Sequence, residues 1–191
     1  MLADRFGPGV PFQKGEALGN DYLVVDVAEL PGPLTPDQAR ALCDRHRGPG
    51  SDGVLAVDLS DGGIRLRIVN PDGTEAEKSG NGLRILAAYL HGRGVVGTDP
   101  FEVQLVKDRV MMCVEKVLDD GTLLVRVDIG RASFRGDAVG FRPVADEALG
   151  VVLSLGDAGT AEINTVSMSN PHCVVFVPRL ERDDFLRRAP R

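Results

Sequence analysis

Short runs of apolar and β-branched residues fill the first 130 positions of the chain, and glycine, proline, aspartate or asparagine separates most of them. Runs of about four to eight such residues are typical of β-strands. Ile64, Leu66 and Ile68 alternate with Arg65 and Arg67, so one face of that strand would be buried and the other polar. The pattern predicts strands at residues 22–27, 54–59, 64–69, 101–106, 110–117 and 122–129. The sequence DGG at 61–63 predicts a hairpin between the second and third of these strands.

Two segments carry helix signals. Thr35, Pro36 and Gln38 combine a capping residue, a proline at the first helical position and a glutamine at the third, which predicts a helix that runs to about Arg45. A second set of apolar residues repeats at helical spacing and predicts a buried helix that begins near residue 80, with Ser79 on its capping side. The members of this set are Leu83, Leu86, Ala87 and Leu90.

The pattern changes near Gly130, where the regular alternation ends. We therefore expect two domains, residues 1–131 and 132–191. The second shows strand signals at 162–168 and 173–177 around a turn at 169–171, followed by a helical tail at 182–188.

Composition describes an ordinary globular protein, with 43% apolar and 26% charged residues among 191. No run approaches the roughly 18 apolar residues of a membrane-spanning helix, and the N-terminal residues do not resemble a signal peptide, so we expect a cytoplasmic protein with no membrane partner. The net charge of −6 disfavours nucleic acid as a partner. The cysteines, Cys43, Cys113 and Cys173, lack metal-site spacing, so we expect small buried apolar side chains rather than disulfides or a metal site.

Glycine-rich segments can bind anions, and the chain contains two patterns of this kind. The pattern GxGxxG occurs at 48–53 and 92–97, but neither copy leaves a strand and opens a helix, so a dinucleotide site is not expected. The sequence SGNG at 79–82 does precede a predicted helix. Its backbone N–H groups would favour a carboxylate or a developing negative charge, although such a segment can also be a simple helix cap.

Several motifs, taken in order, resemble those of the diaminopimelate epimerase family. They are LGND at 18–21, LCDRHRG at 42–48, NPDG at 70–73, SGNGLR at 79–84 and SNPHC at 169–173, and they cover the chain from about Gly19 to Cys173. The resemblance implies an α+β fold of two similar lobes, each a curled sheet around a central helix, with the active site in the cleft between them. It also implies a homodimer, no cofactor and no metal, and a place in lysine and peptidoglycan-precursor biosynthesis.

The resemblance assigns roles to particular residues. Ser79 and His172 would be the catalytic pair, and Asn20, Asn70, Asn81 and Asn170 would bind the ammonium and carboxylate groups of diaminopimelate. Gly80 and Asn81 would also offer backbone N–H groups to the reacting carboxylate. In this family, one acid/base group removes the α-proton and another delivers a proton to the opposite face, which interconverts the LL and meso forms.

The chain departs from the family pattern at two points. Ser79 stands where the family normally has a catalytic cysteine, and a hydroxyl is several pKa units harder to ionise than a thiol. The family's remaining motifs, a Glu-Arg pair and a second-lobe Cys-Gly-Thr/Ser-Gly segment, are not recognised in these 191 residues. We therefore expect an incomplete second lobe, either in a fragment or in a naturally shortened protein, and impaired epimerase activity.

Other functions remain open beside the impaired epimerase. The chain could be a catalytically inactive relative that binds an amino acid or a partner subunit. It could also be a one-base isomerase or dehydratase that uses Ser79 and His172. Nucleophilic hydrolysis by Ser79 has little support, because no carboxylate can be assigned from the sequence to orient His172.

Overall fold

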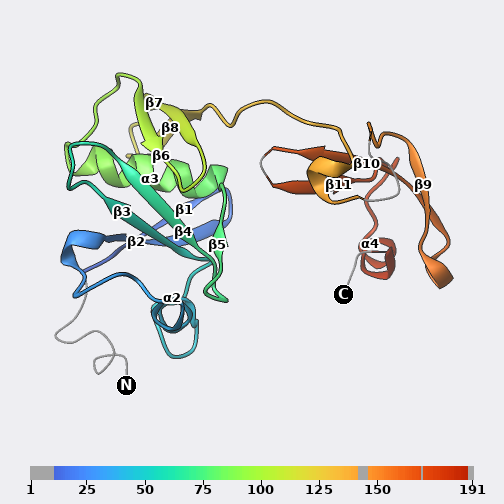
Figure 1. The fold of residues 1–191 in the computed structure, drawn as a ribbon, viewed down its shortest axis with the longest axis horizontal. Helices are drawn as coiled ribbons and strands as arrows, with labels where there is room; N and C mark the ends of the chain where they lie inside the picture. Colours follow the sequence, from blue (N-terminus) through green and yellow to red (C-terminus); the bar gives the residue numbers. More distant parts are fainter. Residues whose placement is uncertain (1–10, 142–145, 169, 189–191) are drawn as a thin grey trace. The chain divides into compact units, whose positions relative to one another are not determined.

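The computed structural model describes residues 11–141, 146–168 and 170–188. The chain divides into two compact units, Met1–Ile129 and Gly130–Arg191, and each is described by itself (Figure 1). None of the helices in the described part of the chain has both the length and the apolar character that crossing a bilayer requires. Assignment of the units as epimerase lobes with the boundaries 1–131 and 132–191 remains a prediction.

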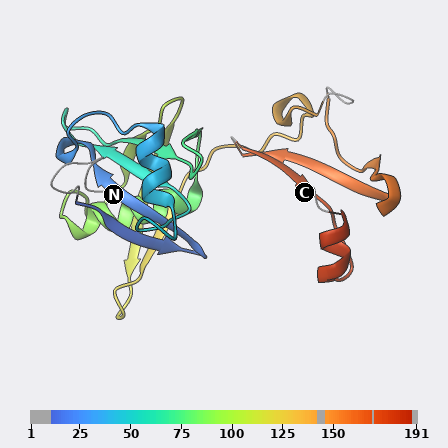
Figure 2. The same cartoon turned by 90° about the horizontal axis from the view of Figure 1, so that it is seen from below.

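The described part of the first unit holds one mixed sheet in the order β1-β2-β3-β4-β6-β7-β8, with the short β5 paired to β4. Its β2–β3 and β4–β6 pairs are parallel, and the other pairs are antiparallel. The strands are β1 (Gln13–Ala17), β2 (Asn20–Asp26), β3 (Val54–Asp58), β4 (Arg65–Val69), β5 (Glu75–Ala76), β6 (Phe101–Gln104), β7 (Arg109–Val117) and β8 (Leu123–Val127). The β7–β8 hairpin extends beyond the rest of the unit (Figure 2).

The sheet curls around helix α3 (Gly80–Gly92), which contacts β1 and β2 at one end of the sheet and β7 and β8 at the other. Four helix residues selected by their spacing, Leu83, Leu86, Ala87 and Leu90, are fully buried. The prediction of a buried central helix is therefore confirmed, and so is the α+β class with a curled sheet.

The central strands are buried on both faces because a second helix covers the side opposite α3 (Figure 1). Tyr22 and Val24 of β2 face α3, whereas Leu23 and Val25 pack towards α2 (Pro36–Cys43), as the two-residue period of a strand requires. The predicted capping box of α2 is present. The helix ends two residues before the predicted Arg45 because Asp44 has extended backbone angles.

The described residues of the second unit form a three-stranded antiparallel sheet in the order β11-β10-β9. Its elements are β9 (Val151–Ser154), β10 (Thr160–Ser167), β11 (Pro171–Val174) and α4 (Arg182–Arg188). Single-turn helices at Val27–Glu29, Asp137–Val139 and Gly156–Ala158 complete the described elements. β9 lies in a region without clear alternation and was not predicted.

The strand predicted at 173–177 differs from β11, which begins at Pro171 and ends at Val174. Its pairing with β10 starts at Pro171, the last residue of the predicted turn, and Ser169 of that turn lies outside the described residues. Residues 175–177 continue the apolar run, but they pair with no strand in the described part of the unit, and Phe176 is 81% exposed. The prediction from apolar character alone therefore put both ends of this strand too far along the chain.

The expectation that the cysteines are buried holds only for Cys43. Burial raises the pKa of the Cys43 thiol. Cys113 is partly exposed and its Sγ donates to the Thr98 carbonyl at 3.2 Å. Cys173 is exposed on β11, an edge strand of the small sheet, so this part of the prediction is wrong.

Candidate functional site

Ser79 is the N-cap residue of α3 and holds a half-buried hydroxyl at the helix terminus. Its Oγ accepts a hydrogen bond from the Gly82 N–H at 3.0 Å. The same oxygen lies 3.2 Å from the hydroxyl oxygen of Tyr22, which is 8% exposed. Because the positive end of the helix dipole favours negative charge, Ser79 sits where an anion or a developing anion is stabilised.

The first turn of α3 also presents unused backbone donors. The first N–H groups of a helix have no acceptor within the helix. Ser79 satisfies those of Gly82 and Leu83 through its side chain and its carbonyl. The N–H groups of Gly80 and Asn81 have no acceptor among the described residues. These two groups can therefore bind a carboxylate, the role that the family resemblance implies for them.

Asn20 joins this cluster from the start of β2. Its Oδ1 accepts a hydrogen bond from Asn81 Nδ2 at 2.7 Å, and its own Nδ2 donates to Asp52 Oδ2 at 3.2 Å. Since Tyr22 lies two residues further along the same strand, β2 supplies both a partner for Asn81 and a partner for Ser79. The structure thus brings together three of the residues selected from the sequence, Asn20, Ser79 and Asn81, with Gly80 between the last two.

Asn70 occupies a different setting at the end of β4. Its Nδ2 donates to Thr74 Oγ1 at 3.0 Å, and its backbone N–H donates to the Thr74 carbonyl at 2.8 Å. These bonds close the turn between β4 and β5. No hydrogen bond in the described residues joins Asn70 to Asn20, Ser79 or Asn81, so its role in substrate binding remains a prediction.

Asn170 and His172 lie in the second unit, where both are exposed. His172 Nε2 is 3.1 Å from Asn170 Oδ1. An amide oxygen only accepts hydrogen bonds, so this contact places a proton on Nε2. The pairing of His172 with Ser79 that the family resemblance implies remains a prediction.

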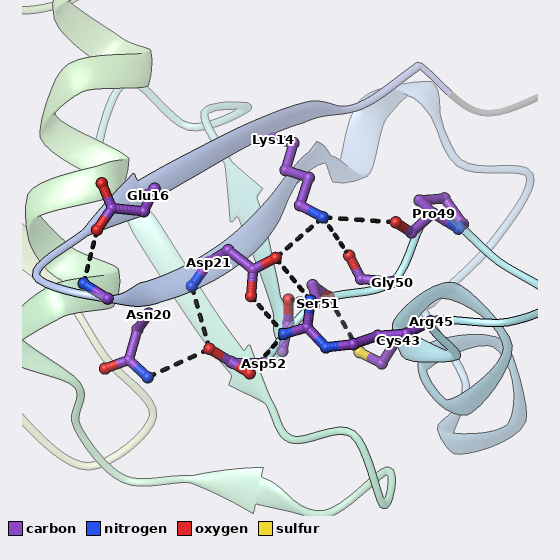
Figure 3. A network of polar contacts seen from close by, with 12 residues as sticks. Lys14, Glu16, Asn20, Asp21, Cys43, Arg45, Pro49, Gly50, Ser51 and Asp52 are labelled. Carbon is purple, nitrogen blue, oxygen red and sulfur yellow. Dashed lines mark hydrogen bonds and ion pairs between the residues drawn. The ribbon is translucent and has the colours of Figure 1, made fainter.

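Four charged residues support the Asn20 end of the cluster (Figure 3). Arg45 binds Asp21 through two nitrogens, at 2.6 and 3.1 Å, and reaches Asp52 at 2.7 Å. Lys14 approaches Asp21 at 2.9 Å and donates to the Gly50 carbonyl at 2.7 Å. The hydrogen bond from Arg45, together with Lys14, holds the pKa of Asp21 far below its usual range, so this carboxylate stays ionised.

Lys78 fixes the segment that leads into Ser79. Its side chain is 3% exposed, and its Nζ donates to Asp108 Oδ2 at 2.5 Å and to the Ile129 carbonyl at 3.1 Å. The hydrogen bond from Lys78 lowers the pKa of Asp108. Lys78 therefore ties the start of α3 to the last residue of the first unit.

Sequence reasoning missed Tyr22, Asp52 and Lys78. Tyr22 was interpreted as an apolar strand residue, and its position two residues after Asn20 was the available signal. Asp52 lies within the glycine-rich segment at 48–53, and Lys78 directly precedes the SGNGLR motif, but both bear on the site through contacts distant in sequence. The described residues contain no group of three or more His, Cys, Asp or Glu side chains placed to hold a metal ion.

Comparison with solved structures defines the class of fold. A protein from Pseudomonas aeruginosa described as a predicted epimerase matches 94% of this chain with a TM-score of 0.62, at 18% identity and over 62% of its own length. A probable proline racemase from Agrobacterium radiobacter matches 87% of this chain with a TM-score of 0.56, at 15% identity and over 52% of its length. At these identities the likeness concerns the fold alone.

The sequence comparisons are more specific. The diaminopimelate epimerase family model matches residues 12–135. Diaminopimelate epimerase 2 of a Nostoc species is 39% identical over 170 residues, and the diaminopimelate epimerase of Pelotomaculum thermopropionicum is 38% identical over 183. These alignments cover 87% and 94% of this chain. The chain belongs to the diaminopimelate epimerase family, as the motifs indicated.

The alignments cover only part of the relatives. The chain spans 57% of the length of the Nostoc protein and 64% of that of the Pelotomaculum protein. The activity, substrates and partners of those proteins therefore enter below as proposals.

Proposed function

We propose that the chain provides one half of a diaminopimelate epimerase site, in which Ser79 acts on one face of the substrate's α-carbon and epimerisation is impaired. The observation that carries this proposal is the position of Ser79 Oγ at the N-terminus of α3, beside the hydrogen-bonded Asn20 and Asn81 side chains. Family membership supports an amino-acid isomerase that uses no cofactor.

The arrangement suits an α-amino acid. The free N–H groups of Gly80 and Asn81 would bind the carboxylate next to the reacting carbon and stabilise the charge that builds on it when the α-proton leaves. Ser79 would accept or return that proton, with His172 as its partner from the second unit. Asn70 and Asn170 would bind the remaining ammonium and carboxylate groups of diaminopimelate.

Impairment follows from the chemistry of the hydroxyl. A thiol with a pKa of about 8.5 is readily tuned into a thiolate base, whereas a hydroxyl must be ionised at a further cost of about 1.4 kcal/mol for every pKa unit. The Gly82 N–H and the Tyr22 hydroxyl stabilise an oxygen anion in part, but they are neutral donors. Ser79 is therefore a weak base at neutral pH.

A second candidate is a catalytically inactive relative that binds diaminopimelate or a related amino acid. The substitution at position 79 leaves the amide cluster and the helix N-terminus intact, which favours retained binding. A one-base isomerase or dehydratase that uses Ser79 and His172 is the alternative among enzymes. Isothermal titration calorimetry with diaminopimelate, combined with an assay for its isomers, separates these possibilities.

Binding without conversion would identify the inactive relative, and conversion of any amino acid would identify an isomerase. Failure to bind diaminopimelate would contradict both assignments. We further propose a cytoplasmic homodimer in lysine biosynthesis, with the two units as the first lobe and part of the second. Sedimentation of the purified chain tests the dimer, and a monomer at micromolar concentration would contradict it.

A further inference from the structure

The side chains of Asn20 and Asn81 form a hydrogen-bonded chain that ends on Asp52. Asp52 Oδ2 accepts from Asn20 Nδ2 at 3.2 Å and from the Asp21 backbone N–H at 3.1 Å. Asn20 Oδ1 then accepts from Asn81 Nδ2 at 2.7 Å. The chain connects the loop before β3, the start of β2 and the first turn of α3.

The direction of these hydrogen bonds follows from the chemistry of Asp52, where the series ends. An ionised carboxylate accepts hydrogen bonds and donates none, so Asp52 requires the NH2 group of Asn20 to face it. The oxygen of Asn20 must then face Asn81, whose side chain can donate to it only through its own NH2 group. Asn81 Oδ1 is left as the acceptor at the far end, and it has no partner among the described residues.

Asp52 is itself held in place by charge. Its Oδ1 accepts from Arg45 Nη2 at 2.7 Å, and the same guanidinium binds Asp21 (Figure 3). Gly50 allows the loop between α2 and β3 to pass close to the backbone of Arg45. Its φ is +71°, and a Cβ at this position would lie 2.8 Å from the Cα of Arg45. The segment between α2 and β3 is therefore built to present the carboxylate of Asp52 to Asn20.

We propose that Asp52 is a positioning residue that sets the orientation of both amides, so that Asn81 offers its carbonyl oxygen to a protonated amino group of the substrate. This inference rests on the proposed function, which places the substrate at Asn20 and Asn81, and it adds which group is recognised there. An amide oxygen accepts from an ammonium group but repels a carboxylate, so the oriented pair selects amines over acids.

Substitution of Asp52 by asparagine tests this proposal. The variant keeps the size of the side chain but can donate as well as accept, so the Asn20 amide is no longer forced into one orientation. Asp61→Asn is the matched control, because Asp61 also accepts from an arginine, Arg65 Nη2 at 2.6 Å, in the distant β3–β4 turn.

Two ligands separate positioning from general damage. Diaminopimelate carries two amino groups, and pimelate is the same dicarboxylate without them. Asp52→Asn should weaken diaminopimelate binding about tenfold, as expected for one hydrogen bond to a charged group, and leave pimelate binding within about twofold. Asp61→Asn should change neither. Equal weakening of both ligands by Asp52→Asn, or no weakening of either, overturns the proposal.

A double variant provides a rescue. When Asn20→Asp is combined with Asp52→Asn, the carboxylate moves to position 20, where it can accept from the new amide at position 52 and from Asn81 Nδ2. The Asn81 amide then points its oxygen outwards again. The double variant should recover at least half of the change in log Kd for diaminopimelate that Asp52→Asn causes. A double variant that is weaker than Asp52→Asn contradicts the proposal.

A measurement without ligand keeps the inference separate from the proposed function. The side-chain NH2 signals of Asn81 in a ¹⁵N–¹H spectrum should move when Asp52 is substituted and stay in place in Asp61→Asn. If the parent chain binds no diaminopimelate but these signals move, the proposed function fails and the orienting role of Asp52 stands. If the signals do not move, the orienting role fails whatever the chain binds.

Discussion

The hydroxyl oxygens of Ser79 and Tyr22 lie 3.2 Å apart, so the residue at the candidate catalytic position is bonded to the core face of β2. Ser79 Oγ already accepts from the Gly82 N–H, and a hydroxyl has one donor and two acceptor positions. Ser79 therefore serves as a helix cap in addition to any role in proton transfer. Substitutions at this position should change stability as well as chemistry.

We expect Ser79→Ala to lower the free energy of unfolding by about 1 kcal/mol through loss of the cap, and Tyr22→Phe to lower it by about 1 kcal/mol through loss of the hydroxyl contact. Because the two hydroxyls are partners, the double variant should lose less than the sum, by about 0.5 kcal/mol or more. Urea unfolding measures all three values.

The other tyrosine of the chain is the control for this cycle. The Tyr89 hydroxyl accepts from Arg93 near the C-terminal end of α3 and does not contact Ser79. Tyr89→Phe and Ser79→Ala should therefore be additive. If Tyr22→Phe and Ser79→Ala are as additive as Tyr89→Phe and Ser79→Ala, the Ser79–Tyr22 hydrogen bond contributes nothing to the free energy of unfolding.

Asp21 should make stability depend on pH. Its pKa is far below the ordinary value of 3.8 in the folded chain because of Arg45 and Lys14, so its stabilising effect is present above about pH 4 and is lost as the pH falls towards the folded pKa. We expect Asp21→Asn to be about 1 kcal/mol less stable than the parent at pH 7, and this difference should shrink steadily below pH 4.

A helix-surface pair provides the comparison. Asp37 is 83% exposed and binds Arg40 at 2.5 Å, so Asp37→Asn should cost less than about 0.5 kcal/mol at every pH. The measurement is chemical denaturation of the three proteins between pH 2 and 7. A difference for Asp21→Asn that grows as the pH falls would reverse the sign expected for a carboxylate stabilised in its charged form.

Lys78→Met should destabilise the first unit by about 1–3 kcal/mol. The methionine keeps most of the volume but leaves the Ile129 carbonyl and Asp108 without their partner. Cleavage by a protease close to residues 129–131 should also become faster. Lys107→Met is the control: Lys107 is 72% exposed and pairs with Glu77, so its loss should cost less than about 0.5 kcal/mol. Equal effects of the two substitutions would contradict the anchoring role of Lys78.

Much of the fold follows from local pattern. Residues 64–68 alternate strictly, and 83–90 repeat at helical spacing, so β4 and α3 could be predicted from the sequence. β9 could not, because its region lacks alternation and its partner β10 comes later in the chain. Similarly, α2 was expected to reach Arg45, but Arg45 leaves the helix to bind Asp21 and Asp52. Long-range ion pairs of this kind leave no periodic signal.

The motif residues of the candidate site could be predicted from the sequence, but the residues that contact them could not. Ser79, Gly80 and Asn81 are adjacent in the chain, so a helix N-terminus brings them together by itself. The contact between Asn20 and Asn81 joins residues 61 positions apart, and that between Tyr22 and Ser79 joins residues 57 apart. Such contacts depend on the curl of the sheet around α3, which strand patterns do not specify.

Restoring a thiol at position 79 should restore one half of the chemistry. Proton exchange on one face needs a single working base, whereas inversion needs acid/base groups on both faces. We therefore expect Ser79→Cys to exchange the α-proton of diaminopimelate with solvent deuterium at least tenfold faster than the parent, without producing the other isomer. Mass spectrometry in D₂O and chiral separation measure the two outcomes. Inversion by this variant, or no gain in exchange, would contradict the assignment of Ser79 to one face.

The inversion rate of the 191-residue chain itself tests most directly whether it is an impaired half-site. LL-diaminopimelate is incubated with the purified chain, and the meso isomer is quantified over time by chiral chromatography. We expect the chain to bind the substrate and to invert it far more slowly than about 1 s⁻¹, because Ser79 is a weak base and the 191 residues lack the family's second cysteine segment. Inversion at about 1 s⁻¹ or faster would contradict both the role given to Ser79 and the proposal of an impaired half-site.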